Sequence, residues 1–130
     1  MTDEQDELIQ HLKGVREIVI NKCYGGFSLS HKAELLYLKL AMIDYTTTDR
    51  ISRDETERYG SLILIDDVEW SGKEISRDDP VLVAVVKRLG NSSWGKYSEL
   101  KIVKIPADVQ WQVDSYDGNE WVAEAHRRWT

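Results

Sequence analysis

Residues 18–30 restrict the fold more than any other stretch of the chain. Residues 18–20 are β-branched and apolar, which is typical of a buried strand. Gly25 and Gly26 follow and indicate a turn, because glycine adopts backbone angles that other residues avoid. Ser30 then suits the N-cap position of a helix. A strand that leads through a glycine turn to a helix N-terminus, with its free N–H groups, is a common design for an anion pocket.

The rest of the chain alternates between helix and strand signals. Apolar spacing and cap residues predict helices, and short apolar or alternating runs predict strands. The clearest helix has Asp79 as its cap, Pro80 at its first position and Gly90 at its end. With caps included, the predicted helices cover residues 3–13, 30–42, 79–89 and 119–129, and the predicted strands cover residues 15–22, 61–66, 100–105 and 109–114, with a short edge strand within 70–75.

These elements predict an α+β or α/β fold, with one domain over residues 1–130. We expect two layers, with about four helices on a mixed sheet of about four or five strands. The polar residues 46–58 are predicted to form a loop, and the strands at 100–105 and 109–114 to pair with each other. The helix at 30–42 carries more apolar residues than one buried face needs, so we expect it to be buried on several sides or to lie at a subunit interface.

Composition excludes several classes of protein. The net charge of −6 argues against binding of extended nucleic acid, which needs a positive face. The single cysteine, Cys23, rules out an internal disulfide, and the acidic N-terminus lacks the features of a signal peptide. No apolar run approaches the roughly 20 residues of a membrane span. We therefore expect a cytoplasmic protein with no membrane contact.

Several clusters contain residue types that suit a phosphate-bearing nucleotide. Lysine and arginine neutralise phosphate, glycine lets a ligand approach the backbone, and aromatic rings stack on bases. Tyr24 or Phe27 can supply such a ring beside the glycine turn. The candidate ligand contacts are Lys22, Tyr24, Gly25, Gly26, Ser28, Arg77, Trp94, Lys96, Tyr97 and Arg127.

Each of these candidates also has a structural explanation. The glycine turn equally suits a tight connection with no ligand, and Arg77 can form a local ion pair with Asp78. The loop at 94–97 can be a packed lid, and the cations in the tail at 126–129 suit the negative end of a helix dipole. The sequence leaves both explanations open for every cluster.

Signals for catalysis are weaker. Cys23 lies near a predicted helix N-terminus, where a thiolate is stabilised, and His31 or His126 would be its partner. No cysteine or histidine spacing matches a metal site. We assign no catalytic residue, metal or cofactor from the sequence. Five tryptophans in a chain of this length favour a homo-oligomer, because aromatic residues are enriched at interfaces.

The stretch INKCYGGFSLS at residues 20–30 resembles a motif of small proteins encoded by bacteriophages. The resemblance continues through residues 77–80 with their helix, 100–111, and 116 to the tail, and leaves out 1–15 and 44–75. The group implies no particular activity. A phage origin implies a role against host defence, for which one strategy is to sequester a nucleotide-derived immune signal.

The sequence therefore predicts a protein that binds a phosphate-bearing, nucleotide-derived ligand without transforming it. Two alternatives belong to other classes. The first is an inhibitor or adaptor that binds a host protein, and the second is a small hydrolase or transferase that acts on a nucleotide. Intact recovery of a bound nucleotide would separate the ligand-binding prediction from both alternatives.

Overall fold

The computed structural model of the protein describes residues 14–51 and 58–125. Helices and antiparallel strands together form an α+β fold. The helices are α2 (His31–Leu40) and α3 (Pro80–Leu89), with short 3₁₀-helices η1 (Gly72–Glu74) and η2 (Gly90–Ser93), and the strands are β1 (Val15–Asn21), β2 (Thr46–Ile51), β3 (Arg58–Ile65), β4 (Val68–Glu69), β5 (Leu100–Pro106), β6 (Trp111–Tyr116) and β7 (Asn119–Glu124).

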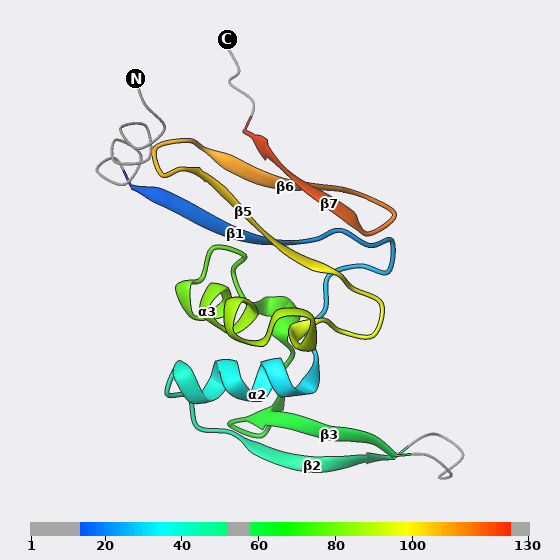
Figure 1. Ribbon diagram of the computed structural model, residues 1–130. Helices are drawn as coiled ribbons and strands as arrows, with labels where there is room; N and C mark the ends of the chain where they lie inside the picture. The colour runs from blue at the N-terminus through cyan, green and yellow to red at the C-terminus, as the bar shows by residue number, and fades with distance from the viewer. Residues whose placement is uncertain (1–13, 52–57, 126–130) are drawn as a thin grey trace.

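The two α-helices lie between two groups of strands (Figure 1). β1 and β5 cover one side of α3, with the β6–β7 hairpin beyond them, and α2 separates α3 from the β2–β3 pair. The described strands form three separate sheets, β1–β5, β2–β3–β4 and β6–β7, and every pairing is antiparallel. The prediction of one mixed sheet is therefore wrong for the described residues.

Strand partners differ from those expected. β5 pairs with β1 along its whole length, from Leu100 opposite Asn21 to Pro106 opposite Val15. The run at 109–114, expected beside β5, instead contributes to β6 and pairs with β7. Here β1, which is distant in sequence, is the partner of β5.

Two of the three helix starts predicted within the described residues are confirmed. Ser30 caps α2, and its hydroxyl accepts a hydrogen bond from the Ala33 N–H at 3.1 Å. Asp79 caps α3 and accepts from the Val81 N–H at 2.8 Å. Gly90 ends α3 with a φ of 55°, in the left-handed region that glycine tolerates. Caps satisfy N–H groups that a helix leaves unpaired within its first turn. They can therefore be predicted from a few neighbouring residues of the sequence. None of the described helices is long and apolar enough to cross a membrane.

The predicted helix at 119–129 is wrong, because residues 119–124 form strand β7. Asp117 and Gly118 both adopt positive φ, 49° and 87°, as a two-residue hairpin turn requires. The turn brings Asn119 opposite Tyr116 and starts the β6–β7 ladder. Asn119 therefore begins a strand and does not cap a helix. The expected total of about four helices falls to two α-helices in the described residues, and the one predicted at 3–13 lies outside them.

Residues 46–51 form β2 where a loop was predicted. Their threonines are β-branched and suit a strand once a partner is present, and β3 supplies that partner. β3 contains residues 61–65 of the strand predicted at 61–66, and Asp66 lies in the turn that follows. The edge strand expected within 70–75 is displaced to β4, and η1 occupies residues 72–74.

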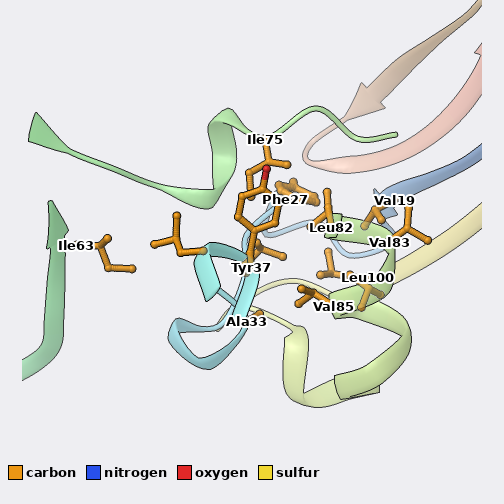
Figure 2. Close-up of a cluster of buried hydrophobic side chains, with 13 residues drawn as sticks. Val19, Phe27, Ala33, Tyr37, Ile63, Ile75, Leu82, Val83, Val85 and Leu100 are labelled. Atoms are coloured by element: carbon orange, nitrogen blue, oxygen red, sulfur yellow. The ribbon is translucent and has the colours of Figure 1, made fainter. Parts of the chain in front are cut away.

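One hydrophobic cluster joins the helices to strands on both sides. Figure 2 shows side chains of β1, α2, β3, α3 and β5 meeting in this cluster. Val19, Leu38, Leu82 and Val85 are completely buried. Burial of each such side chain contributes roughly 1.5–3 kcal/mol, so this cluster supplies much of the driving force for folding. It also fixes the positions of the loops that leave these elements at one end of the fold.

Candidate functional site

A cleft of about 410 Å³ opens where three loops and strand β7 meet. One loop is the glycine turn after β1, the second contains η1 and the residues from there to Arg77, and the third follows η2. Of the residues predicted to contact a ligand, Gly25, Gly26, Ser28, Arg77, Lys96 and Tyr97 line this cleft, and Phe27, Lys73 and Glu120 complete it.

The glycine turn is a close-packed junction. A Cβ on Gly25 would overlap the backbone carbonyl and Cβ of Tyr97, and Gly26 has a φ of 89°. From the other side, Gly118 packs against the Gly26 N–H, where a Cβ would also not fit. The glycines are therefore needed for packing, and this supports the structural explanation of the turn.

Helix α2 contributes no residue to the cleft lining. The Ser30 hydroxyl accepts from the Ala33 N–H and donates to the Ser92 carbonyl at 2.6 Å. The N-terminus of α2 is thus capped internally and held against the η2 loop. The expectation that the N–H groups of this helix would face the ligand is not met by the lining of the cleft.

Asn21 holds the glycine turn in place. Its side-chain amide donates to the carbonyls of Cys23 and Gly118, at 2.5 and 2.7 Å, and its side-chain carbonyl accepts from the Glu99 N–H at 2.9 Å. Asn21 is completely buried. One side chain therefore joins the end of β1, the β6–β7 turn and the start of β5. The sequence carried one signal for this role, a polar residue directly after an apolar strand.

Arg77 and Glu120, which both line the cleft, form a partly buried ion pair in which the Arg77 side chain is 21% exposed and the Glu120 side chain 9%. The two guanidinium nitrogens donate to the two carboxylate oxygens at 2.5 and 2.9 Å. Glu120 also accepts the Asn21 N–H at 2.8 Å. The expected pair with Asp78 is wrong, because Asp78 binds Arg16 at 2.9 Å instead. We call Asn21, Arg77 and Glu120 the cleft network.

The Arg77 guanidinium lies 3.6 Å from the centre of the Phe27 ring. This cation–π contact covers one face of a ring that is only 7% exposed. Phe27 is therefore a core side chain and is not available to stack on a base, so a stacking ring would have to come from another aromatic residue.

Lys73, Lys96 and Tyr97 form the cleft rim. Tyr97 is 64% exposed, and the Lys96 ammonium lies 5.4 Å from the centre of its ring. Within the described part of the chain, neither lysine has a carboxylate partner. Since Arg77 and Glu120 neutralise each other, the two rim lysines leave the cleft positively charged on a protein with a net charge of −6.

The remaining predicted contacts do not line the cleft. The Lys22 ammonium donates to the backbone carbonyl of Glu120 at 3.1 Å, and Tyr24 is exposed beside the turn. Trp94 forms a β-bridge with Leu29. Arg127 lies outside the described residues.

Tyr37 is a titratable group outside the cleft that has structural partners. The Tyr37 hydroxyl donates to Asp79 at 2.6 Å, and its ring stacks on Trp70 with centres 5.9 Å apart. Burial, followed by the hydrogen bond to Asp79 and the negative charge of Asp79, raises the pKa of Tyr37 to about 12. Among the described residues, no group of three or more His, Cys, Asp or Glu is arranged to hold a metal ion.

Comparison of the chain with protein-family models, with curated proteins and with solved structures gives no match.

Proposed function

We propose that the protein binds a small phosphate-bearing nucleotide in this cleft and releases it unchanged. The observation that carries the proposal is the cleft rim, where two lysines without carboxylate partners among the described residues line the same cleft as an exposed tyrosine. The Arg77–Glu120 pair below the rim is neutral as a unit, so the charge available to a ligand comes from Lys73 and Lys96.

The geometry suits a ligand with both an anionic and an aromatic part. Ammonium groups stabilise phosphate through charge-assisted hydrogen bonds, each worth roughly 1.5–3 kcal/mol. An exposed tyrosine ring can stack on a base, which contributes about 1–3 kcal/mol. Tyr97 and Lys96 are neighbours in sequence, so base and phosphate would be recognised side by side.

The resemblance to small phage proteins favours one class of ligand, a nucleotide-derived signal of host defence. A protein that sequesters such a signal needs affinity and an intact ligand, and it needs no catalytic group. A cleft of about 410 Å³ is within the usual range of small-molecule sites. This part of the proposal rests on the resemblance and on ligand chemistry.

The proposal is tested by recovery of a bound ligand. Purified protein is incubated with a pool of linear and cyclic nucleotides, washed and heat-denatured, and the released compounds are identified by mass spectrometry. We expect one compound to be recovered intact and in an amount that approaches that of the protein. A converted product would indicate an enzyme, and recovery of nothing would contradict nucleotide binding.

Single variants then locate the site. With the recovered nucleotide as probe, Lys73→Ala or Lys96→Ala should weaken binding roughly 10- to 100-fold, because each removes one charge-assisted contact. Lys101→Ala is the matched control, since Lys101 is exposed on β5 and does not line the cleft. Equal affinity of all three variants would place the ligand elsewhere.

A further inference from the structure

A second concave surface lies between α2 and α3, separate from the cleft. It has a volume of about 590 Å³, and its apolar lining comes from Leu35, Leu36, Tyr45 and Leu89. We call it the α2–α3 groove. The buried residues of α2 are Ala33, Tyr37 and Leu38. Leu35 and Leu36 pack against the edge of the same core and are only partly buried, so part of their apolar surface lines the groove.

The α2–α3 groove is bordered by cations. Lys32 and Lys39 lie on α2, one turn before and one turn after the leucines, and Arg88 faces them from α3. None of the described residues that line the groove is acidic. Among the described residues none of the three cations has a carboxylate partner. An apolar strip between unpaired cations is complementary to an amphipathic helix with acidic flanks.

The sequence at residues 3–12 has the residue spacing of such a helix. Leu8, Ile9 and Leu12 follow helical spacing, and acidic residues precede and flank them. Positions 5, 8, 9 and 12 repeat the i, i+3, i+4, i+7 spacing that positions 32, 35, 36 and 39 use in the groove. On a helix, Glu4 and Asp6 would flank this face on opposite sides, where they could meet the groove cations.

We propose that the α2–α3 groove binds residues 3–12 of a second copy of the chain, and that this contact makes the protein a dimer. A second copy fits better than the same copy. Only Lys13 and Gly14 connect the segment to β1, and α3 lies between β1 and α2 (Figure 1). Two residues span at most about 7 Å, less than the roughly 10 Å width of a helix. The same copy therefore cannot lay the whole segment along α2.

Charge reversal on the full-length chain tests this contact. The groove variant carries Lys32→Glu and Lys39→Glu, and the segment variant carries Glu4→Lys and Asp6→Lys. We expect sedimentation velocity to show a wild-type dimer, and each variant alone to associate at least roughly tenfold more weakly, because like charges would face each other. An equimolar mixture of the two variants should form a heterodimer, since each groove would again meet a segment of opposite charge.

Lys101→Glu combined with Lys104→Glu is the matched control, because both lysines are exposed on β5. This control should dimerise like the wild type, and thermal melting checks that every variant is folded. A monomeric wild type, a dimer that survives both reversals, or a mixture that stays monomeric would each overturn the proposal. A wild-type monomer that instead captures an acidic helix of another protein would equally overturn self-association.

Discussion

The cleft network and the cleft rim lie in the same cleft, but they differ in how their polar groups are satisfied. In the network, Glu120 accepts hydrogen bonds from both guanidinium nitrogens of Arg77 and from the Asn21 N–H. At the rim, Lys73 and Lys96 have no carboxylate partner among the described residues. The network is thus complete without a ligand, whereas the rim leaves charge available for one.

The comparison distinguishes residues that hold the cleft together from residues that are available to bind a ligand. Arg77 has the residue type expected of a phosphate contact, yet its charge is already compensated at 2.5 and 2.9 Å. A buried pair of this kind costs stability when one partner is removed, but it offers little net charge to a ligand. Variants of the network should therefore change stability, and variants of the rim should change affinity.

The largest expected effect is that of Glu120→Ala. It leaves the Arg77 charge and the Asn21 N–H without a partner in a site where the Glu120 side chain is only 9% exposed. We expect the free energy of unfolding in urea to fall by about 3–5 kcal/mol. Glu124→Ala, at an exposed position of the same strand, should change it by less than about 0.5 kcal/mol. Equal losses in the two variants would remove the structural role of the network.

Gly25→Ala should have the next largest effect. The added methyl group would meet backbone atoms of Tyr97, which cannot move aside as a flexible side chain would. We expect a loss of about 2–3 kcal/mol in urea unfolding, together with weaker ligand binding because the loop that carries Lys96 shifts. Gly26→Ala is the comparison, since its Cβ meets no atom and only its φ of 89° is strained. That variant should lose about 1 kcal/mol, and a larger loss at Gly26 than at Gly25 would contradict the packing argument.

Tyr37→Phe tests the hydrogen bond between Tyr37 and Asp79, which lies outside the cleft. Loss of the hydrogen bond to Asp79 should lower the free energy of unfolding by about 1–2 kcal/mol at pH 7. Because the pKa of Tyr37 is raised to about 12, the folded state favours the protonated hydroxyl. This contribution is complete below about pH 10, the pKa of an unfolded tyrosine, and is lost as the pH rises towards 12.

The difference in stability between wild type and Tyr37→Phe should therefore shrink over that range of pH. The measurement is urea unfolding of both proteins at matched pH values, so that other titrating groups cancel. Tyr116→Phe, at an exposed tyrosine, should show no such dependence. A difference that stays constant from pH 8 to pH 12 would contradict the assigned role of the Asp79 contact.

The smallest expected effect on stability is at the rim. Lys73→Ala and Lys96→Ala should each change the free energy of unfolding by less than about 0.5 kcal/mol, because neither lysine has a carboxylate partner among the described residues and Lys96 contacts only the exposed Tyr97 ring. The same variants should weaken nucleotide binding, so affinity and stability respond to different residues. A loss of stability as large as that of Glu120→Ala would remove the distinction between rim and network.

Much of the local structure was readable from the sequence, because its causes lie within a few residues. Ser30, Asp79 and Gly90 cap their helices through contacts with adjacent N–H groups or through their own backbone angles. The helix predicted at 119–129 was wrong at its start, because Asn119 suits a helix cap as well as the first position of a strand. Cap and strand-start signals look alike at such a position, and pairing with β6 decides between them.

The cleft was predicted only in part. Residues of the glycine turn were expected to share a ligand with Trp94, Lys96 and Tyr97, and the structure brings Lys96 and Tyr97, but not Trp94, to the same cleft. Lys73 and Glu120 were missed, because the sequence around a charged residue does not indicate which distant segment it will pack against. The resemblance, the ligand and the oligomeric state remain predictions.

The sequence by itself determined the helix caps, the glycine turn and the apolar runs, since each depends on interactions between near neighbours in the chain. Only the tertiary structure decided which charges are satisfied and which remain available. Arg77 lies 43 residues from Glu120, and Asn21 lies 99 residues from it, so their contacts depend on how β1, β7 and the loop before α3 are packed. Long-range packing, governed by burial of the shared core, therefore pairs the polar groups of the cleft network with one another. It leaves the lysines of the cleft rim available as a candidate binding site.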